Sequence, residues 1–560
     1  MTAAPQSAMK GTGIGQAVAV GPVARMSPPP ALPTDEPSAL TPEQETARVK
    51  AAIDAVAADL TTRGQAAGGQ AQEVLEAQVM MAQDPTVSEA VEAQIAAGSA
   101  GEYAVHAAFR EVAETLQALG GYLGERAADL HDVATRVIAE LRGEPAPGVP
   151  DPGHPFVLVA QDLAPADTAL LNLDQVLALV TIEGGPTSHT AILARGQGIT
   201  AVVGVKDASA LTDGDEVIVD AKNSEVLAGP SAEQKAEAAE RIAQRAAVQA
   251  APITDGALAD GTEIPLLANL GTPDNAAEAV ELGAEGVGLF RTEFLFLSSD
   301  SAPSVAEQRE SYQQLLEAFP GKKVVVRALD AGADKPLPFL NDAEEENPAL
   351  GLRGLRALLT NEEVLRDQLT ALAEADQATE ADLWVMAPMV STVEETETFA
   401  KFAHQHGLKT AGVMVEVPSS ALLAEQILAT ADFASIGTND LTQYTMAADR
   451  LLGSVAGLQD PWHPAVLKLV REVGAAGTKT GKTVGVCGEA AADPLLAVVL
   501  VGLGVTTLSM APAALADVRA ELLRHTKEQA QALAEAALTA STAAEALEAA
   551  RAAAASHSSE

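Results

Sequence analysis

The hydrophobic pattern of the chain changes twice along its first half. Residues 11–23, rich in Gly, Val and Ala, predict short strands, whereas residues 41–143 carry helical periodicity without a strand signal. Strand-like runs then return at 156–160, 176–182, 201–205 and 216–220. The pattern predicts a discontinuous α/β domain, residues 1–30 and 144–229, that carries an inserted all-helical domain at residues 31–143.

The second half repeats a strand followed by a helix. A charged, Ala-rich helical stretch at 230–251 is expected to link it to the first half. Eight strand-like runs follow, at 264–269, 286–290, 323–329, 383–389, 411–415, 432–436, 483–487 and 506–510. Their span is close to the ~250 residues typical of a (β/α)8 barrel, which we expect over residues 252–525. The remaining Ala-rich residues, 526–560, are interpreted as a low-complexity tail.

Polar residues collect at the ends of the predicted barrel strands. Reading along the barrel, these ends carry Asn269, Arg291, Arg327 with Asp330, Pro388 with Met389, Glu416, Asn439 with Asp440, Cys487 and Ser509. Bulky apolar residues fill the strand interiors. Because barrels of this kind place their chemistry at the carboxyl ends of the strands, the pattern predicts a site at one rim.

The arginines of this rim predict an anion site. Arg291 and Arg327, with Arg353 and Arg450 near other strand ends, offer planar forks of donors that match phosphate and carboxylate oxygens. Each charged hydrogen bond contributes roughly 1.5–3 kcal/mol, so that several together can hold a small trianion. Surface salt bridging is the alternative role for these arginines.

Other rim residues suggest a cation and a proton donor. Glu416 and Asp440 end successive strands and present the hard oxygen ligands that Mg²⁺ prefers, although either carboxylate could instead orient an arginine. Asn439 can donate to a substrate oxygen. Cys487 is by default a small buried hydrophobe, and its place at a strand end raises the alternative that it donates a proton to a reacting carbon.

A second candidate site lies in the first half of the chain. His189 follows the strand at 176–182 and the Gly-Gly-Pro break at 184–186, so it is expected in the first turn of the next helix. Free backbone N–H groups and the helix dipole favour negative charge there, and they would stabilise a phosphate carried on the imidazole. A simple helix cap is the alternative role for this histidine.

Net charge limits the classes of partner that the protein can bind, and cysteine content indicates its location. The 77 acidic residues exceed the 35 basic ones, and the net charge of −42 argues against nucleic acid or an anionic membrane as a partner. A neutral or basic protein partner fits better. The single cysteine permits no internal disulfide, which favours a cytoplasmic location. We expect no signal peptide, because residues 1–10 lack a basic segment followed by an apolar run. We expect no membrane insertion, because the longest apolar run, residues 495–503, is far shorter than the ~20 residues that cross a bilayer.

Several continuous segments resemble one known family. Residues 184–195 (GGPTSHTAILAR) resemble the phosphohistidine loop of the phosphoenolpyruvate-utilising enzymes. The barrel adds 286–296 (GVGLFRTEFLF), 346–353 (ENPALGLR), 412–418 (GVMVEVP), 435–446 (SIGTNDLTQYTM) and 486–489 (VCGE). Together these segments are similar, nearly without gaps, to the enzyme I family of the bacterial phosphoenolpyruvate-dependent sugar phosphotransferase system.

This resemblance implies an activity and a role for each site residue. A member of the family would transfer the phosphoryl group of phosphoenolpyruvate to His189 and then to a histidine of the phosphocarrier protein HPr, releasing pyruvate, as the first step of sugar uptake. Glu416 and Asp440 would be Mg²⁺ ligands, and Cys487 would protonate the enolate of pyruvate. The residues that would bind the substrate are Arg291, Arg327, Asn439 and Arg450.

The resemblance also implies partners. In the family the helical insertion docks HPr, and the barrel forms a homodimer. The candidates for docking are the acidic Glu73, Glu76 and Asp84 and the apolar Met80 and Met81. The sequence departs from the family on this surface, because residues 64–78 are less charged than expected and Gln78 stands where a histidine is common.

Related enzymes fit the sequence less well. A pyruvate phosphate dikinase or a phosphoenolpyruvate synthase shares the histidine loop and the barrel but needs a large ATP-binding domain, and the short helical N-terminal region has no glycine-rich phosphate loop. The nitrogen-related paralogue would carry an additional N-terminal sensory domain, which we do not expect here. An inactive regulatory relative would be expected to have lost site residues, yet His189, Arg327, Glu416, Asp440 and Cys487 are all present.

Overall fold

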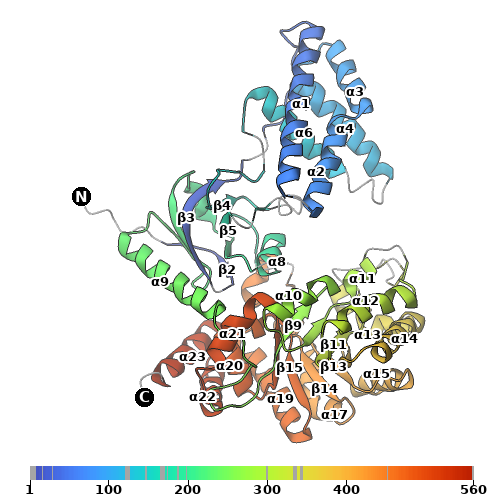
Figure 1. Ribbon diagram of the computed structural model, residues 1–560, viewed down its shortest axis with the longest axis vertical. Helices are drawn as coiled ribbons and strands as arrows, with labels where there is room; N and C mark the ends of the chain where they lie inside the picture. Colours follow the sequence, from blue (N-terminus) through green and yellow to red (C-terminus); the bar gives the residue numbers. More distant parts are fainter. Residues whose placement is uncertain are drawn as a thin grey trace. The chain divides into compact units, whose positions relative to one another are not determined.

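The computed structural model divides into two compact units (Figure 1). One unit contains residues 1–195 and 199–242, and the other contains residues 196–198 and 243–560. The structure describes the chain except for residues 1–7, 16, 28–29, 68, 120–126, 146–147, 164–170, 173–174, 186–187, 197, 298–300, 332–336, 338, 341–344, 451 and 558–560.

An eight-stranded sheet forms the α/β part of the first unit. Its strands are β1 (Met9–Lys10), β2 (Thr12–Ile14), β3 (Val18–Arg25), β4 (Phe156–Ala160), β5 (Val176–Thr181), β6 (Ala201–Val203), β7 (Glu216–Asp220) and β8 (Glu225–Ala228). They are hydrogen-bonded in the order β1-β8-β7-β3-β4-β5-β6-β2. Because β3 pairs in parallel with β4, strands from before and after the helical segment lie in one sheet. The short strand β8, antiparallel to β7, was not predicted from the sequence.

Helices make up the segment between β3 and β4. They are α1 (Pro42–Ala67), α2 (Gly69–Ala82), α3 (Pro85–Ala96), α4 (Gly101–Leu119) and α6 (Ala127–Arg142). Asp84 caps the start of α3, because its side chain accepts a hydrogen bond from the backbone N–H of Thr86 at 2.7 Å. Apolar side chains such as Leu60, Phe109 and Val137 form a core of their own within this bundle.

Helices also flank and follow the sheet. α8 (His189–Gly196) begins at the predicted position, and α9 (Ala232–Gln249) leads into the second unit. On α9, Arg241 pairs with Asp220 of β7 at 3.1 Å, and Arg245 pairs with Asp517 at 3.1 Å. Two ion pairs about one helical turn apart therefore hold the second half of this helix.

The second unit is built on a closed barrel of eight parallel strands. These are β9 (Leu266–Leu270), β10 (Val287–Phe290), β11 (Lys323–Arg327), β12 (Asp382–Ala387), β13 (Ala411–Val415), β14 (Phe433–Ile436), β15 (Thr483–Val486) and β16 (Thr507–Met510). Each lies within two residues of a predicted strand at either end. The predicted fold class, an α/β sheet domain with a helical insertion and a C-terminal (β/α)8 barrel, is confirmed.

Helices surround the barrel. They are α10 (Ala276–Glu281), α11 (Glu293–Leu297), α12 (Val305–Glu317), α13 (Leu355–Thr360), α14 (Glu362–Ala378), α15 (Val393–Gln405), α16 (Pro418–Leu422), α17 (Ala424–Leu428), α18 (Thr438–Met446), α19 (Pro464–Thr480), α20 (Pro494–Gly502) and α21 (Leu515–Leu522). Short 3-10 helices occur at Lys206–Ala210, Pro273–Asn275, Pro348–Leu350, Gly453–Leu458, Glu489–Ala492 and Pro512–Ala514.

Alternation along the strands divides the apolar residues between two cores. On β11, Val324 and Val326 belong to the large core between strands and helices. Val325 belongs instead to a small cluster within the barrel, together with Met414 of β13. Side chains two residues apart on a strand share a face, so Arg327 is expected to follow Val325 and Glu416 to follow Met414 toward the barrel axis.

The C-terminal residues pack onto the barrel rather than extending from it as a tail. They form α22 (Lys527–Leu538) and α23 (Ala543–His557), and both contribute buried side chains to the barrel's large core. Small residues permit a close approach: a Cβ atom added to Gly502 on α20 would lie 2.1 Å from the carbonyl oxygen of Ala530. The alanines of this segment are therefore packing residues.

Across the part of the chain that the structure describes, no helix combines the length and the apolar character needed to cross a membrane.

Candidate functional site

The strand ends of the barrel bring most of the predicted site residues to one mouth. Arg327 is the last residue of β11, while Arg291, Glu416 and Cys487 directly follow β10, β13 and β15. Asn439 and Asp440 lie in the first turn of α18, which follows β14. Because all eight strands are parallel, these ends share one side of the barrel.

Arg327 lies at the centre of this mouth, where it is buried among three carboxylates. Its Nη2 atom donates to Glu293 Oε1 at 2.8 Å, and its Nη1 atom lies 3.3 Å from Asp330 Oδ2 and 3.8 Å from Glu416 Oε1. Burial alone would lower the pKa of Arg327, but the three carboxylates outweigh it and raise the pKa. The guanidinium is therefore a permanent positive charge inside the mouth.

A second chain of charges runs from Asp330 to Arg450. Arg353 donates from Nη2 to Asp330 Oδ2 at 3.2 Å and from Nη1 to Asp440 Oδ1 at 2.9 Å. Arg450 donates to the other oxygen of Asp440 at 3.4 Å. Burial raises the pKa of Asp330, but Arg327 and Arg353 outweigh it and hold the pKa below its ordinary value. Arginines and carboxylates thus alternate across the mouth, and each side chain fixes the orientation of the next.

Glu416 is the carboxyl group whose surroundings least favour its negative charge. Burial, together with the neighbouring charges of Asp440 and Asp330, raises the pKa of Glu416 to about 8. Its Oε2 atom accepts a hydrogen bond from the backbone N–H of Met389 at 2.9 Å. Met389 provides this bond from a left-handed backbone conformation, with φ 56°, a conformation that non-glycine residues rarely adopt. A strained backbone of this kind occurs most often at functional sites.

The carboxylates of this mouth fit a magnesium ion. Among the described residues, no group of three His, Cys, Asp or Glu side chains is arranged to hold a metal. Mg²⁺ needs no such group, because it usually takes one or two carboxylates and completes its shell with water and substrate phosphate. Burial, and then the charges of Asp440 and Asp330, raise the pKa of Glu416, and a bound divalent cation would favour the charged form of this carboxyl group.

Cys487 and Asn439 lie on the same side of the barrel as the charged network. The Cys487 thiol is buried, and this burial raises its pKa to about 11, so at neutral pH it carries its proton. The side-chain oxygen of Asn439 accepts a hydrogen bond from the backbone N–H of Glu489 at 3.0 Å, and the amide nitrogen takes no part in this bond. The backbone carbonyl of Cys487 accepts from Asn269 at 2.9 Å, so a strand end holds the segment that carries the thiol.

Arg291 is the most open arginine of the group. Its side chain is exposed, and its guanidinium carbon lies 5.9 Å from the centre of the Phe294 ring. Arg327, Glu293 and Glu489 are close enough to interact electrostatically with the Arg291 guanidinium. Arg291 therefore lies beside the buried network, where its N–H groups can bind a ligand.

His189 belongs to the other compact unit, in which it is the first residue of α8. Ser188 precedes it, and the Ser188 Oγ atom accepts from the backbone N–H of Ala191 at 3.3 Å, so this serine caps the helix. The side chain of His189 lies outside the described part of the structure, as do Pro186 and Thr187. The backbone position agrees with the expected helix start.

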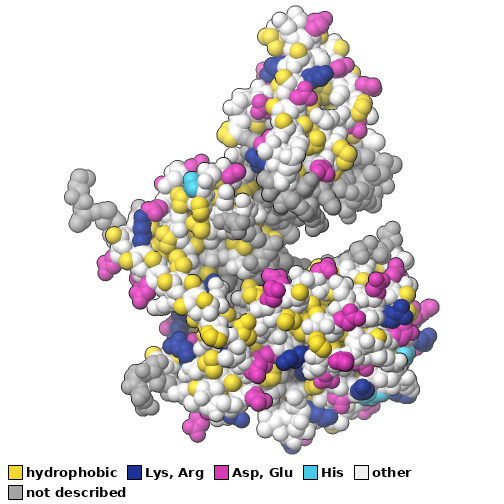
Figure 2. All heavy atoms as spheres, in the orientation of Figure 1, with side chains coloured by type: hydrophobic (Ala, Val, Ile, Leu, Met, Phe, Trp, Pro, Cys, Tyr) yellow, Lys and Arg dark blue, Asp and Glu magenta, His cyan; other side chains and the backbone are white. Residues whose placement is uncertain are grey.

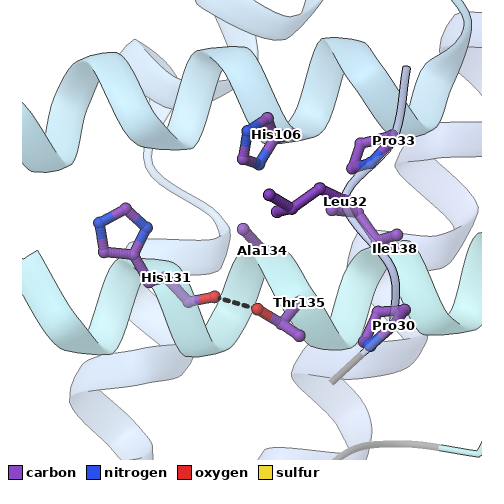
Figure 3. A pocket seen from close by; sticks show the side chains of 8 residues that line it. All are labelled: Pro30, Leu32, Pro33, His106, His131, Ala134, Thr135 and Ile138. Carbon is purple, nitrogen blue, oxygen red and sulfur yellow. Dashed lines mark hydrogen bonds between the residues drawn. The ribbon is translucent and has the colours of Figure 1, made fainter. Parts of the chain in front are cut away.

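A pocket of about 320 Å³ lies within the helical insertion, remote in sequence from both candidate sites. Figure 3 shows its lining, with His106 and His131 on two helices and Leu32 pointing between them. Its walls are otherwise Pro30, Pro33, Ala134, Thr135 and Ile138. The lining contains neither an arginine nor a carboxylate, so the pocket lacks the charged groups that are expected to bind phosphoenolpyruvate and Mg²⁺ at the barrel mouth.

Two residues of the mouth were not assigned a role from the sequence. Glu293 is buried against Arg327, and Tyr444 accepts from Arg353 at 3.2 Å and donates to the carbonyl of Ala349. Each lies in a segment that resembles the family, and that resemblance was the available signal. The pairing of Glu293 with Arg327, 34 residues away, depends on barrel closure.

Known proteins match this chain over most of its length. Three family models match the chain, described as the PEP-utilising enzyme N-terminal domain over residues 7–126, its mobile domain over residues 152–224 and its PEP-binding domain over residues 245–527. A phosphoenolpyruvate-protein phosphotransferase of Streptomyces coelicolor is 52% identical over 543 residues, which cover 96% of this chain and 97% of that protein. Proteins of the same name match from Bacillus subtilis, at 36% identity over 95% of this chain and 97% of the relative, and from Haloferax volcanii, at 41% identity over 83% and 84%.

Proposed function

Because this chain belongs to the phosphoenolpyruvate-protein phosphotransferases of the PEP-utilising enzyme family, we propose that it transfers the phosphoryl group of phosphoenolpyruvate to its own His189 and then to a histidine of HPr. One structural observation supports the proposal independently of the sequence similarity. The barrel mouth joins Arg327, Arg353 and Arg450 to carboxylates in one buried network. Such a network suits a small trianion that arrives with a divalent cation.

In this proposal the mouth binds phosphoenolpyruvate and stabilises its reacting groups. Arg291, Arg327 and Arg450 contact the phosphate and carboxylate oxygens, and the amide of Asn439 donates to the substrate. The buried pairing of the arginines supports this role, because preorganised donors stabilise transition-state charge without having to reorient. The neutral imidazole of His189 attacks phosphorus, and the bond from phosphorus to the enol oxygen breaks.

Glu416 and Asp440 are proposed to hold the magnesium ion. The ion supplies Lewis-acid stabilisation of charge on the phosphoryl oxygens when it is bound. The chain's own contribution is to keep both carboxylates in place, through the N–H of Met389 for Glu416 and through Arg353 and Arg450 for Asp440.

Cys487 is proposed to complete the reaction at carbon. Departure of the phosphoryl group leaves the enolate of pyruvate, and the thiol donates its proton to the terminal carbon to give pyruvate. The raised pKa of about 11 supports this role, since the proton is present on the thiol at neutral pH. The thiolate left behind recovers a proton from solvent.

The domain division expected from the sequence is part of the proposal. Residues 1–30 and 144–229 carry the phosphohistidine, residues 31–143 receive HPr, and residues 252–525 bind phosphoenolpyruvate. Since His189 and the mouth belong to separate compact units, transfer requires His189 to meet first the substrate and then HPr, with residues 230–251 as the linker.

The helical insertion offers features that suit a basic carrier protein. Glu76 and Met80 are exposed on α2, with Met80 68% exposed, and acidic side chains are scattered over the visible face of the bundle (Figure 2). Gln78 is instead buried and donates to Asp129 and Asp132, so it supports the bundle from within. The side chain of Glu73 lies outside the described residues.

The barrel is proposed to form a homodimer. Leu422 at the end of α16 and the adjacent Leu423 are 67% and 38% exposed. A neighbouring pair of exposed leucines is unfavourable in water, and a second copy of the barrel would cover it. A cytoplasmic location stays a prediction, based on the single cysteine.

The test uses phosphoenolpyruvate labelled on phosphorus. We expect the wild-type chain with Mg²⁺ to acquire acid-labile label and to pass it to HPr, and we expect His189→Ala to acquire none while it unfolds at the wild-type temperature. Label on the His189→Ala variant would contradict the assignment of the histidine. A wild-type chain that stays unlabelled would contradict the function.

A further inference from the structure

Glu293 occupies an unusual position at the mouth. It is the first residue of α11 and is 1% exposed, although it lies two residues after the exposed Arg291. Burial of a carboxylate costs free energy of folding unless its charge is paired. The groups that pair with Glu293 therefore indicate its role.

Glu293 ties two strand ends together. Its Oε1 atom accepts from Arg327 Nη2 at 2.8 Å and from the backbone N–H of Asp330 at 3.2 Å. The preceding Thr292 donates from its hydroxyl to the backbone carbonyl of Arg327 at 3.1 Å. The segment that carries Arg291 is thus fastened to the end of β11 at three points.

The pair uses only part of its hydrogen-bonding capacity. Glu293 Oε2 and Arg327 Nε are both buried, and neither has a hydrogen-bond partner in the described structure. A side-on two-pronged pair would have used both of these atoms. Nη1 of Arg327 takes no part in the bond to Glu293 and lies near Asp330 and Glu416, where the substrate and cation are proposed to bind.

We propose that Glu293 is a positioning residue that sets the spacing between Arg291 and Arg327 at the phosphate-binding mouth. It holds the guanidinium of Arg327 directly, and it holds Arg291 through the two peptide bonds that separate them. This inference rests on the proposed function, because it concerns how the same mouth recognises phosphoenolpyruvate.

A purely electrostatic effect of Glu293 predicts the opposite result. If its negative charge only weakened the attraction of the mouth for a trianion, removal of that charge would tighten substrate binding. If Glu293 positions the arginines, a shorter side chain weakens substrate binding even when the negative charge remains. Two substitutions separate these effects. Glu293→Gln keeps the side-chain length and an acceptor oxygen, and Glu293→Asp keeps the charge but has a side chain that is one methylene shorter.

The experiment measures kcat and KM for phosphoenolpyruvate in the full-length chain, with HPr as acceptor. We expect Glu293→Asp to raise KM about tenfold, as loss of one charged hydrogen bond predicts, with a smaller change in kcat. Glu293→Gln should retain a KM within about threefold of wild type. Glu285→Gln is the matched control at the other end of the barrel, where Glu285 accepts from the backbone N–H groups of Gly256 at 2.8 Å and Leu266 at 2.9 Å.

Thermal unfolding of each variant shows whether the barrel is intact. An unchanged KM in a folded Glu293→Asp variant would overturn the positioning role, as would a lowered KM in Glu293→Gln. Wild-type activity is measured first in the same assay. Its absence would overturn the proposed function and this inference together, whereas wild-type activity with an unaltered Glu293→Asp variant would overturn this inference alone.

Discussion

The two ends of the barrel use charge in opposite ways. At the carboxyl ends of the strands, Arg327 and Arg353 are buried among carboxylates and pair in networks. At the amino ends, Lys323 lies 3.6 Å from the centre of the Trp384 ring, which itself lies 4.8 Å from the Phe433 ring. The first end gathers paired charged side chains, and the second is packed with aromatic rings. In the proposed function, the same eight strands therefore have a binding end and a stabilising end.

The largest expected effect comes from breaking the charged end. Asp440→Asn removes the charge that pairs with Arg353 and Arg450 and that is proposed to hold Mg²⁺. We expect phosphoryl transfer to fall by about 10²–10³-fold and the Mg²⁺ titration to shift to higher concentration. Asp382→Asn, at the amino end, is the matched control, because Asp382 accepts from the Trp384 indole at 2.8 Å. An unchanged Mg²⁺ titration in Asp440→Asn would refute the ligand role.

An intermediate effect is expected from opening the aromatic end. Trp384→Ala removes the ring that packs against Phe433 and Lys323. Loss of a large aromatic side chain from a packed site costs about 3 kcal/mol of unfolding free energy. Denaturant titration should show this loss, while KM for phosphoenolpyruvate stays at the wild-type value. A change in KM without a loss of stability would contradict the claim that the aromatic end contributes to stability and not to substrate binding.

The smallest effect concerns the pH dependence of stability at the aromatic end. Burial lowers the pKa of Lys323 to about 8, whereas a lysine in the unfolded chain titrates near 10.4. Between these values the unfolded chain binds more protons, so the contribution of Lys323 to stability rises with pH across this window. Lys323→Met should lack this rise when unfolding free energies at pH 7.5 and pH 10 are compared. Equal pH dependence in both proteins would contradict the lowered pKa.

The barrel could be predicted from the sequence because its strands are short apolar runs rich in β-branched residues. β13 coincides with the predicted run at 411–415, and the strand ends placed Arg327 and Glu416 at the correct rim. The C-terminal helices were harder, because Ala530 and Ala534 give little hydrophobic contrast even though they are buried. Their burial depends on the approach of α20, which no local pattern encodes.

The partners within the site could not be predicted from the sequence. The sequence shows that arginines and carboxylates gather at strand ends, but it does not show which pairs form. Arg353 contacts Asp440 across 87 residues, and the raised pKa of Glu416 arises first from its burial and then from the charges of Asp440 and Asp330. Both depend on closure of the barrel, which joins residues that are distant in the chain.

The central claim is that the charged mouth binds phosphoenolpyruvate together with Mg²⁺. Calorimetric titration of phosphoenolpyruvate into the His189→Ala variant tests it most directly, because this variant can bind substrate without turnover. We predict one site per chain that requires Mg²⁺, that is lost when Arg450→Ala is added, and that survives the addition of Asp382→Asn. Binding that persists in the Arg450→Ala double variant, or that is lost only with Asp382→Asn, would contradict the account.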